Sequence, residues 1–134
     1  MALFAWKDSY SVKNTTLDLQ HKKLIDLINR LHDAMMSGCG KTVVGAVLTE
    51  LVSYTNTHFA DEERRMIACG FSGLAAHKQA HDVFAKQARE YLEQYRNGSI
   101  TISGELLRAL KDWLVNHIEK MDQGYVAALL GKAA

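Results

Sequence analysis

The chain has 134 residues, a length typical of one domain with one hydrophobic core. Hydrophobic residues make up 48% of it and charged residues 23%, which excludes a disordered chain. The 16 Lys and Arg residues balance 15 Asp and Glu residues without a basic block, so the charge excludes electrostatic binding to nucleic acid or anionic lipid. We therefore expect a single soluble domain over residues 1–134.

The first 17 residues form the first expected element, an extended arm that lies over the rest of the fold. Trp6, Tyr10 and Val12 are spaced through a polar stretch without helical periodicity. The arm leads into a helix, for which three residues are candidate N-caps, because Thr and Asp side chains accept hydrogen bonds from the first free N–H groups. These candidates are Thr15, Thr16 and Asp18.

Four amphipathic helices follow the arm. Apolar residues recur at steps of three and four, as in Leu24, Leu27, Ile28 and Leu31. Proline is absent, and glycines gather between these segments, where they mark helix ends. The expected helices are 18–37, 41–69, 72–96 and 104–129. Because the connections are short, neighbouring helices must run antiparallel, which predicts an all-α, up-down-up-down four-helix bundle.

Histidine and carboxylate side chains interrupt the apolar faces of these helices. Taken singly, each is more often a hydrogen-bonded core residue or part of a surface pair than a ligand. Counting from the loops at 1.5 Å of rise per residue, however, places them at one level of the bundle. Burying them together would be very costly unless a metal ion bound them. They are His21, His58, Glu62, His77, His81 and His117.

Two further residues test this count. His32 shares the face of His21 but lies about 16 Å deeper along the axis, so we exclude it as a ligand. Asp122 follows His117 by five residues, which rotates it by about 140° in a regular helix. Either the helix widens locally, as in a π-bulge, or Asp122 is a surface residue and Glu119 or nothing replaces it. The spacing leaves this open.

The donor set indicates more than one ion. Imidazole with carboxylate suits iron, zinc, manganese or copper, and the thiolates of a structural zinc site are missing. Seven donors are too many for a single ion. Two six-coordinate ions with two bridging carboxylates and a bridging oxygen from water would leave one position open. If His77, His81 and His117 saturate one ion, the ion held by His21 and His58 is the open one.

The order of these donors, with the segments LDLQHKKLIDLINRLHDAM, HFADEE, AAHKQAHDVF and WLVNHIEKMD, resembles the hemerythrin family over almost the whole chain. The resemblance implies a non-haem di-iron centre of two iron ions (Fe2+/Fe3+) joined by an oxo or hydroxo bridge. It also implies that Glu62 and Asp122 bridge the ions, which favours Asp122 as a ligand. The implied function is reversible binding of O2 as a carrier, store or delivery protein. The implied metal ligands are His21, His58, Glu62, His77, His81, His117 and Asp122.

Three residues near the implied O2 position complete the expected site. Trp113 and Leu114, one turn before His117, match family positions that form the apolar wall of the O2 pocket. Ordinary core packing is the alternative for both. Tyr125, three residues after Asp122, is a candidate for contact with the ligands from outside.

Other functions use the same features. An enzyme that reduces peroxide or nitric oxide, an O2 or redox sensor, and a metal-free interaction bundle are the alternatives. No Lys, Arg, Ser or spare His can be assigned to the pocket as a proton donor, which favours reversible binding over an enzyme. The expected partner is O2 or a similar small diatomic, and the sequence points to no protein partner.

The expected compartment is the cytoplasm. Residues 1–8 lack a cationic start followed by a long apolar segment, and no stretch approaches the roughly 20 apolar residues of a membrane-spanning helix. Two cysteines, Cys39 and Cys69, fit a reducing compartment, and we expect both to be free thiols.

Overall fold

Long helices account for most of the chain. The computed structural model describes residues 5–38, 41–98 and 104–131, and these ranges contain no strand. The long helices are α1 (Thr15–Met36), α2 (Lys41–Ala68), α3 (Leu74–Arg96) and α4 (Gly104–Asn116). α4 continues into a π-helical turn η2 (His117–Met121), a 3-10 turn η3 (Asp122–Tyr125) and the short α5 (Val126–Leu129). The all-α fold predicted from the sequence is confirmed.

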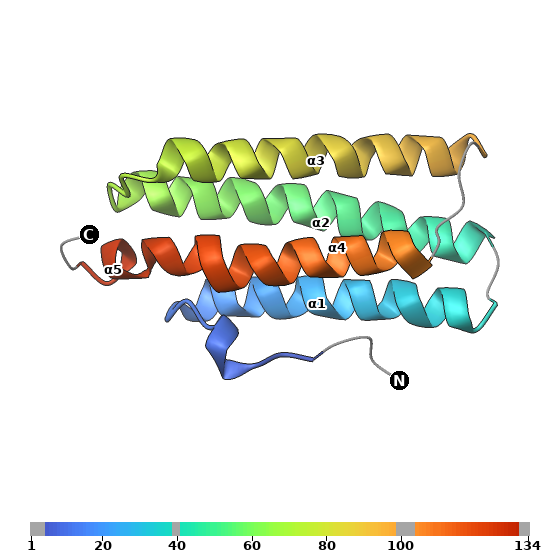
Figure 1. Cartoon of the computed structure of the whole chain (residues 1–134), viewed down its shortest axis with the longest axis horizontal. Helices are drawn as coiled ribbons and strands as arrows, with labels where there is room; N and C mark the ends of the chain where they lie inside the picture. Colours follow the sequence, from blue (N-terminus) through green and yellow to red (C-terminus); the bar gives the residue numbers. More distant parts are fainter. Residues whose placement is uncertain (1–4, 39–40, 99–103, 132–134) are drawn as a thin grey trace.

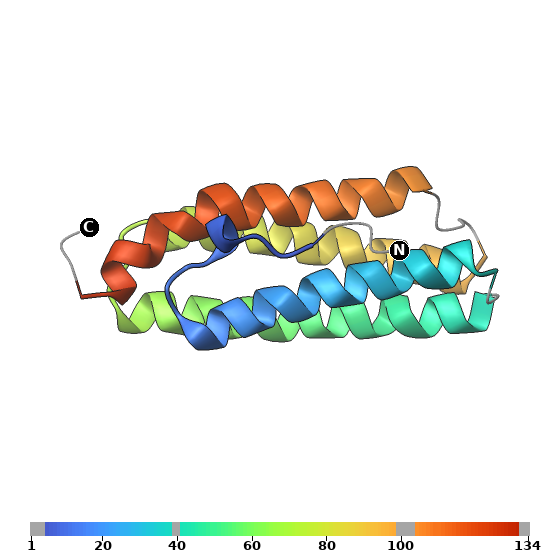
Figure 2. The same ribbon diagram turned by 90° about the horizontal axis from the view of Figure 1, so that it is seen from below.

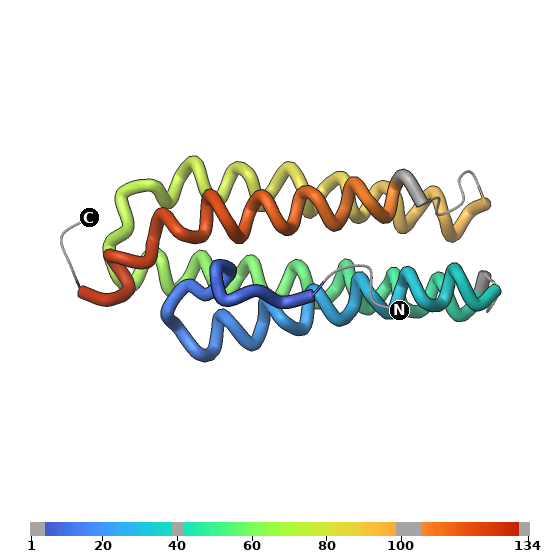
Figure 3. Tube along the Cα trace, turned by 60° about the horizontal axis from the view of Figure 1, so that its bottom comes forward, coloured from blue at the N-terminus to red at the C-terminus, as the bar shows by residue number. Residues whose placement is uncertain are grey.

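The helices run antiparallel to their neighbours (Figure 1). Figure 3 shows two layers, one of α1 with α2 and the other of α3 with α4. α2 packs against both α1 and α3, and α1 also packs against α4. The start of α1, the end of α2, the start of α3 and the end of α4 therefore meet at the same end of the bundle (Figure 1).

Apolar side chains fill the interior between the layers. The main core contains Leu27 and Leu31 from α1, Leu48 from α2, and Leu107 and Leu110 from α4, all buried. Burial of each such side chain contributes about 1.5–3 kcal/mol. A smaller cluster at the end where α1 begins joins the arm to the bundle, and it consists of Val12, Leu17, Met66 and Tyr125.

A tight turn reverses the chain between α2 and α3. Gly70 adopts φ 70°, a left-handed conformation that glycine tolerates best. Its N–H donates to Ile67 O at 3.2 Å, and the N–H of Phe71 donates to Met66 O at 3.0 Å. This pair of hydrogen bonds is the Schellman arrangement that ends helices. The turn brings the first two turns of α3 opposite the last turns of α2.

The first long helix begins earlier than expected. α1 starts at Thr15 rather than residue 18, and its N-cap is Asn14, whose side chain accepts a hydrogen bond from Leu17 N at 3.0 Å. The expectation that Thr15, Thr16 or Asp18 caps the helix is wrong, because Asn14 is the last residue with an extended backbone. Both threonines lie in the first turn.

Hydrogen bonds anchor the N-terminal arm to two parts of the bundle. It contains a 3-10 turn, η1 (Asp8–Tyr10), and crosses the side of the bundle formed by α1 and α4 (Figure 2). Asp18 accepts hydrogen bonds from Ser11 Oγ at 2.6 Å and from Val12 N at 2.9 Å. Gln123 Nε2 donates to Ser11 O at 3.1 Å. Polar contacts thus tie the arm to the start of α1 and to the segment that follows α4.

Two expectations about the environment of the chain concern its helices and cysteines. Within the described ranges, no helix has both the length and the apolar character that a membrane crossing requires. Cys69 is a free, partly buried thiol. Cys39 lies outside the described residues, so the expectation for it stays a prediction.

Candidate metal centre

Seven buried polar side chains meet inside the bundle, near the end where α1 begins. None is more than 4% exposed. The structure brings together every donor singled out in the sequence and leaves out His32, whose partly exposed ring lies 3.7 Å from Asp33 Oδ1. The seven are His21 from α1, His58 and Glu62 from α2, His77 and His81 from α3, and His117 from η2 and Asp122 from η3, the turns that continue α4.

Three of the histidines surround one side of the two carboxylates. Glu62 Oε1 lies 3.1 Å from His77 Nε2, 3.0 Å from His81 Nε2 and 3.7 Å from His117 Nε2. Asp122 Oδ1 lies 3.0 Å from His77 Nε2 and 3.1 Å from His117 Nε2. These five donors lie close enough together to hold one metal ion. We call them the three-histidine group.

The other two histidines face the second oxygen of each carboxylate. Glu62 Oε2 lies 3.3 Å from both His21 Nε2 and His58 Nε2, and Asp122 Oδ2 lies 3.1 Å from His21 Nε2. We call these donors the two-histidine group. Each carboxylate thus offers one oxygen to each group, which is the arrangement of a carboxylate that bridges two ions.

Asp122 reaches the centre because the last helix widens. Residues His117–Met121 form a π-helical turn, in which the N–H of Asp122 donates to His117 O, five residues back. The wider turn offsets the rotation of about 140° that a regular helix would impose. Of the alternatives that the spacing left open, the structure has the widened helix, and Glu119 is exposed.

Opposite charges dominate the electrostatics of the centre. Burial alone would raise the pKa of Glu62 and of Asp122, but the surrounding imidazoles lower both pKa values. Burial likewise acts to lower the pKa of His21 and His77, yet the adjacent Asp122 and Glu62 carboxylates outweigh it and raise each pKa to about 9. The same balance raises the pKa of His117. Two buried anionic carboxylates therefore attract positive charge to this point.

Asp122 tests whether a metal fits. Both of its oxygens are buried, and the imidazole Nε2 atoms that lie 3.0–3.1 Å from them do not form well-directed hydrogen bonds with them. Such orphaned acceptors cost stability unless another group satisfies them. A cation between the two carboxylates would satisfy both oxygens, and all five imidazoles present Nε2 toward the same point. The donors therefore fit a pair of metal ions.

Residues 12–129 match the family model described as the hemerythrin HHE cation binding domain. The chain belongs to the hemerythrin family. It is 42% identical over 125 residues to a bacteriohemerythrin of Stenotrophomonas maltophilia (strain R551-3), a match that covers 93% of this chain and 80% of that protein. A bacteriohemerythrin of Methylococcus capsulatus is 34% identical, covering 93% of this chain and 95% of that protein. The crystal structure of a wild-type hemerythrin superimposes with a TM-score of 0.91 at 32% identity, covering 96% and 98% of the two chains.

In this hemerythrin-family chain, Tyr125 contacts the donors from outside. Its ring is fully buried, and its hydroxyl donates to Glu62 Oε2 at 2.9 Å. Burial and the two nearby carboxylates raise the pKa of the hydroxyl, so it remains protonated and acts as a donor. The expectation that Tyr125 contacts the ligands is confirmed.

Two further outer contacts of this hemerythrin fold were missed in the sequence. Gln20 Oε1 lies 2.6 Å from His58 Nδ1, and Glu63 Oε2 lies 2.8 Å from His81 Nδ1. Burial lowers the pKa of His58, because its contact with Glu62 only partly compensates for the loss of water. The one available signal was position, since Gln20 precedes a donor directly and Glu63 follows one.

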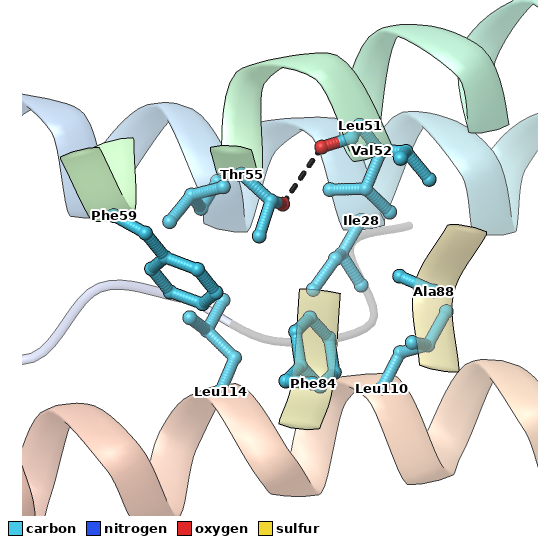
Figure 4. Close-up of a pocket in the computed structure, with 10 residues that line it drawn as sticks. Ile28, Leu51, Val52, Thr55, Phe59, Phe84, Ala88, Leu110 and Leu114 are labelled. Carbon is cyan, nitrogen blue, oxygen red and sulfur yellow. Dashed lines mark hydrogen bonds between the residues drawn. The ribbon is translucent and has the colours of Figure 1, made fainter. Parts of the chain in front are cut away.

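An apolar cavity of about 20 Å³ lies inside the bundle, and none of the seven donors lines it (Figure 4). Leu114, three residues before His117, is one of its walls, and so is Phe59, whose ring stacks on His81 at 3.8 Å. Trp113 does not line the cavity, because its partly exposed ring stacks on His117 at 4.6 Å. The cavity is lined by Leu24, Ile28, Leu51, Val52, Thr55, Phe59, Phe84, Ala88, Leu110 and Leu114.

Proposed function

We propose that this protein binds O2 reversibly at a non-haem di-iron centre, as an oxygen carrier, store or delivery protein. The observation that carries the proposal is the sharing of Glu62 and Asp122 between two groups of imidazoles. Two ions held in this way, with an oxo or hydroxo bridge between them, would have unequal numbers of histidine ligands. The open position would then be on the ion of the two-histidine group.

The proposed ligands hold and orient the ions through rigid helices. Each of the four long helical segments of the bundle contributes at least one donor, so the bundle fixes their separation before an ion binds. Nitrogen and oxygen donors of this kind suit iron. When bound, the iron pair supplies the electrons that make O2 binding possible and reversible. The ligands are His21, His58, Glu62, His77, His81, His117 and Asp122.

Apolar side chains around the centre exclude water. The cavity of about 20 Å³ is large enough for a molecule of the size of water, but its walls are almost entirely apolar. Thr55 is its one polar residue, and its hydroxyl donates to Leu51 O at 2.7 Å, within its own helix (Figure 4). Such a cavity favours an apolar diatomic over water. The partly exposed ring of Trp113 stacks on His117 and shields this donor from solvent.

An iron count combined with an O2 titration tests the proposal. We expect two iron ions per chain, and a reduced protein that gains an absorption band in O2 and loses it on degassing. The Asp122→Asn variant should hold fewer than two ions, because the amide cannot bridge as an anion. Its control is Glu119→Gln, which neutralises an exposed carboxylate on the same turn and should leave both ions bound.

Two results would overturn the proposal. Fewer than two ions in the unchanged protein would exclude the paired centre. Rapid, irreversible oxidation by O2 with turnover of peroxide would instead assign the centre to an enzyme.

A further inference from the structure

We propose that Glu63 and Gln20 make the two halves of the centre electronically unequal, so that the ion in the three-histidine group is the harder one to reduce. The inference rests on the proposed function, because it concerns the same pair of iron ions. It assigns tuning roles to two residues that touch the ligands and not the ions.

The first step concerns His81 in the three-histidine group. Its Nδ1 lies 2.8 Å from Glu63 Oε2, and its Nε2 faces the shared carboxylates. An ion bound at Nε2 would need that nitrogen without a proton, so the ring proton would reside on Nδ1 and be donated to Glu63. The side chains are 1% and 17% exposed, so water competes little for this hydrogen bond. A carboxylate acceptor draws the ring proton toward itself and makes the opposite nitrogen a stronger donor. Glu63 thus increases electron donation to the ion that His81 binds.

The second step concerns His58 in the two-histidine group. Its Nδ1 donates to Gln20 Oε1 at 2.6 Å. The orientation of this amide is fixed, because Gln20 Nε2 donates to Asp61 Oδ2 at 2.8 Å. Asp61 is itself held by Arg64 and Arg65. The acceptor for His58 is therefore a neutral amide oxygen, which polarises the imidazole less than a carboxylate does.

One contact acts against this difference and three others do not reduce it. Lys78 Nζ lies 3.9 Å from Glu63 Oε1, but it pairs more closely with Asp82, at 2.9 Å. His21 and His117, one in each group, have a buried Nδ1 without a hydrogen-bond partner among the described residues. They therefore do not offset the contrast between Glu63 and Gln20. The hydroxyl of Tyr125 donates to Glu62 Oε2, the oxygen that faces the two-histidine group, and so withdraws electron density from that half.

The differences between the two groups of donors imply an order in which the two iron ions would be reduced. Stronger donors stabilise the higher charge, so the three-histidine group favours the ferric ion. One electron from dithionite, added to a centre with two ferric ions, would reduce the ion of the two-histidine group to the ferrous state. A second electron, at a lower potential, would reduce the other ion.

Exchange of the two acceptors tests the inference. In a redox titration of the iron-loaded protein, Glu63→Gln should raise the lower midpoint potential, and Gln20→Glu should lower the higher one. Both variants should therefore narrow the gap between the two potentials. Loss of Glu63 should also speed removal of iron by a chelator, on the order of 10-fold.

Glu119→Gln is the matched control. It removes an exposed carboxylate two residues after the donor His117. We expect the gap between the two potentials in this variant to equal that of the unchanged protein. If Glu63→Gln and Glu119→Gln shift the potentials alike, or if neither acceptor variant narrows the gap, the inference is overturned. If Glu63→Gln does not fold, Gln20→Glu decides by itself.

The iron content separates this inference from the proposed function. Two ions per chain with an unchanged gap would contradict only the tuning roles of Glu63 and Gln20. Absence of two ions from the unchanged protein would contradict the proposed function itself.

Discussion

At the scale of single residues, Tyr125 both packs in the core and forms a hydrogen bond with a donor of the candidate metal centre. Its ring lies 5.6 Å from that of His77 at an angle of 25°, and it makes a T-shaped contact with the ring of Phe71. A tyrosine that is buried this completely needs a partner for its hydroxyl, and Glu62 provides one. The hydrogen bond also fixes one oxygen of a carboxylate shared by both groups of histidines.

We expect Tyr125→Phe to lower the free energy of unfolding by about 1.5–3 kcal/mol, the range for hydrogen bonds to charged groups. The phenyl ring keeps the packing, but Glu62 Oε2 loses a donor in a place that water does not reach. Urea unfolding measures the loss. Tyr91→Phe is the control, since that hydroxyl accepts an exposed hydrogen bond from Gln87 at 2.9 Å and its removal should cost under about 0.5 kcal/mol. Equal losses in the two variants would contradict the role given to Tyr125.

At the scale of elements, the start of α1 depends on the arm as much as on local propensity. Asn, Asp and Thr all favour the N-cap position, and several of them occur in succession here. Asn14 is the N-cap in the structure, because it is the last residue before α1 whose backbone is extended, with φ −135° and ψ 114°. Asp18, one turn into the helix, accepts hydrogen bonds from the arm instead.

The capping assignment predicts different effects for neighbouring residues. Asn14→Ala should lower the free energy of unfolding by about 1 kcal/mol, because Leu17 N loses its acceptor. Thr16→Ala, in the exposed first turn, should change it by less than about 0.5 kcal/mol. Thermal unfolding of the two variants checks this. A larger loss for Thr16→Ala than for Asn14→Ala would contradict the assignment of Asn14 as the N-cap.

The elements also show what a sequence can and cannot specify here. Helical periodicity and the 1.5 Å rise were sufficient to predict that His21 and His58 lie level. The spacing from His117 to Asp122 fits two backbone geometries, so only the structure could identify the π-helical turn. Glu63 was overlooked because a polar residue beside a donor is usually solvated, and its contact with His81 depends on how α2 packs against α3.

At the scale of the whole molecule, the bundle places an apolar space beside a highly polar one. The cavity has walls from all four long helices, among them Ile28, Leu51, Ala88 and Leu110 (Figure 4). Leu24 of α1 also lines it. Leu24 follows His21 by three residues, which corresponds to about 4.5 Å along the helix axis. One wall of the cavity therefore lies about one helical turn from His21 of the two-histidine group, where the proposed open position lies.

Filling the cavity should slow O2 binding without loss of iron. Ala88→Val adds two carbon atoms to a wall of a space of about 20 Å³, so less room remains for a diatomic. We expect the association rate of O2, measured by stopped-flow absorption on the reduced protein, to fall several-fold, with an overpacking cost of about 1–3 kcal/mol in stability. Ala109→Val, on the exposed face of α4, is the control and should bind O2 at the unchanged rate. Equal rates in the two variants, with two ions bound in each, would show that O2 reaches the centre by another route, because only Ala88 borders the cavity.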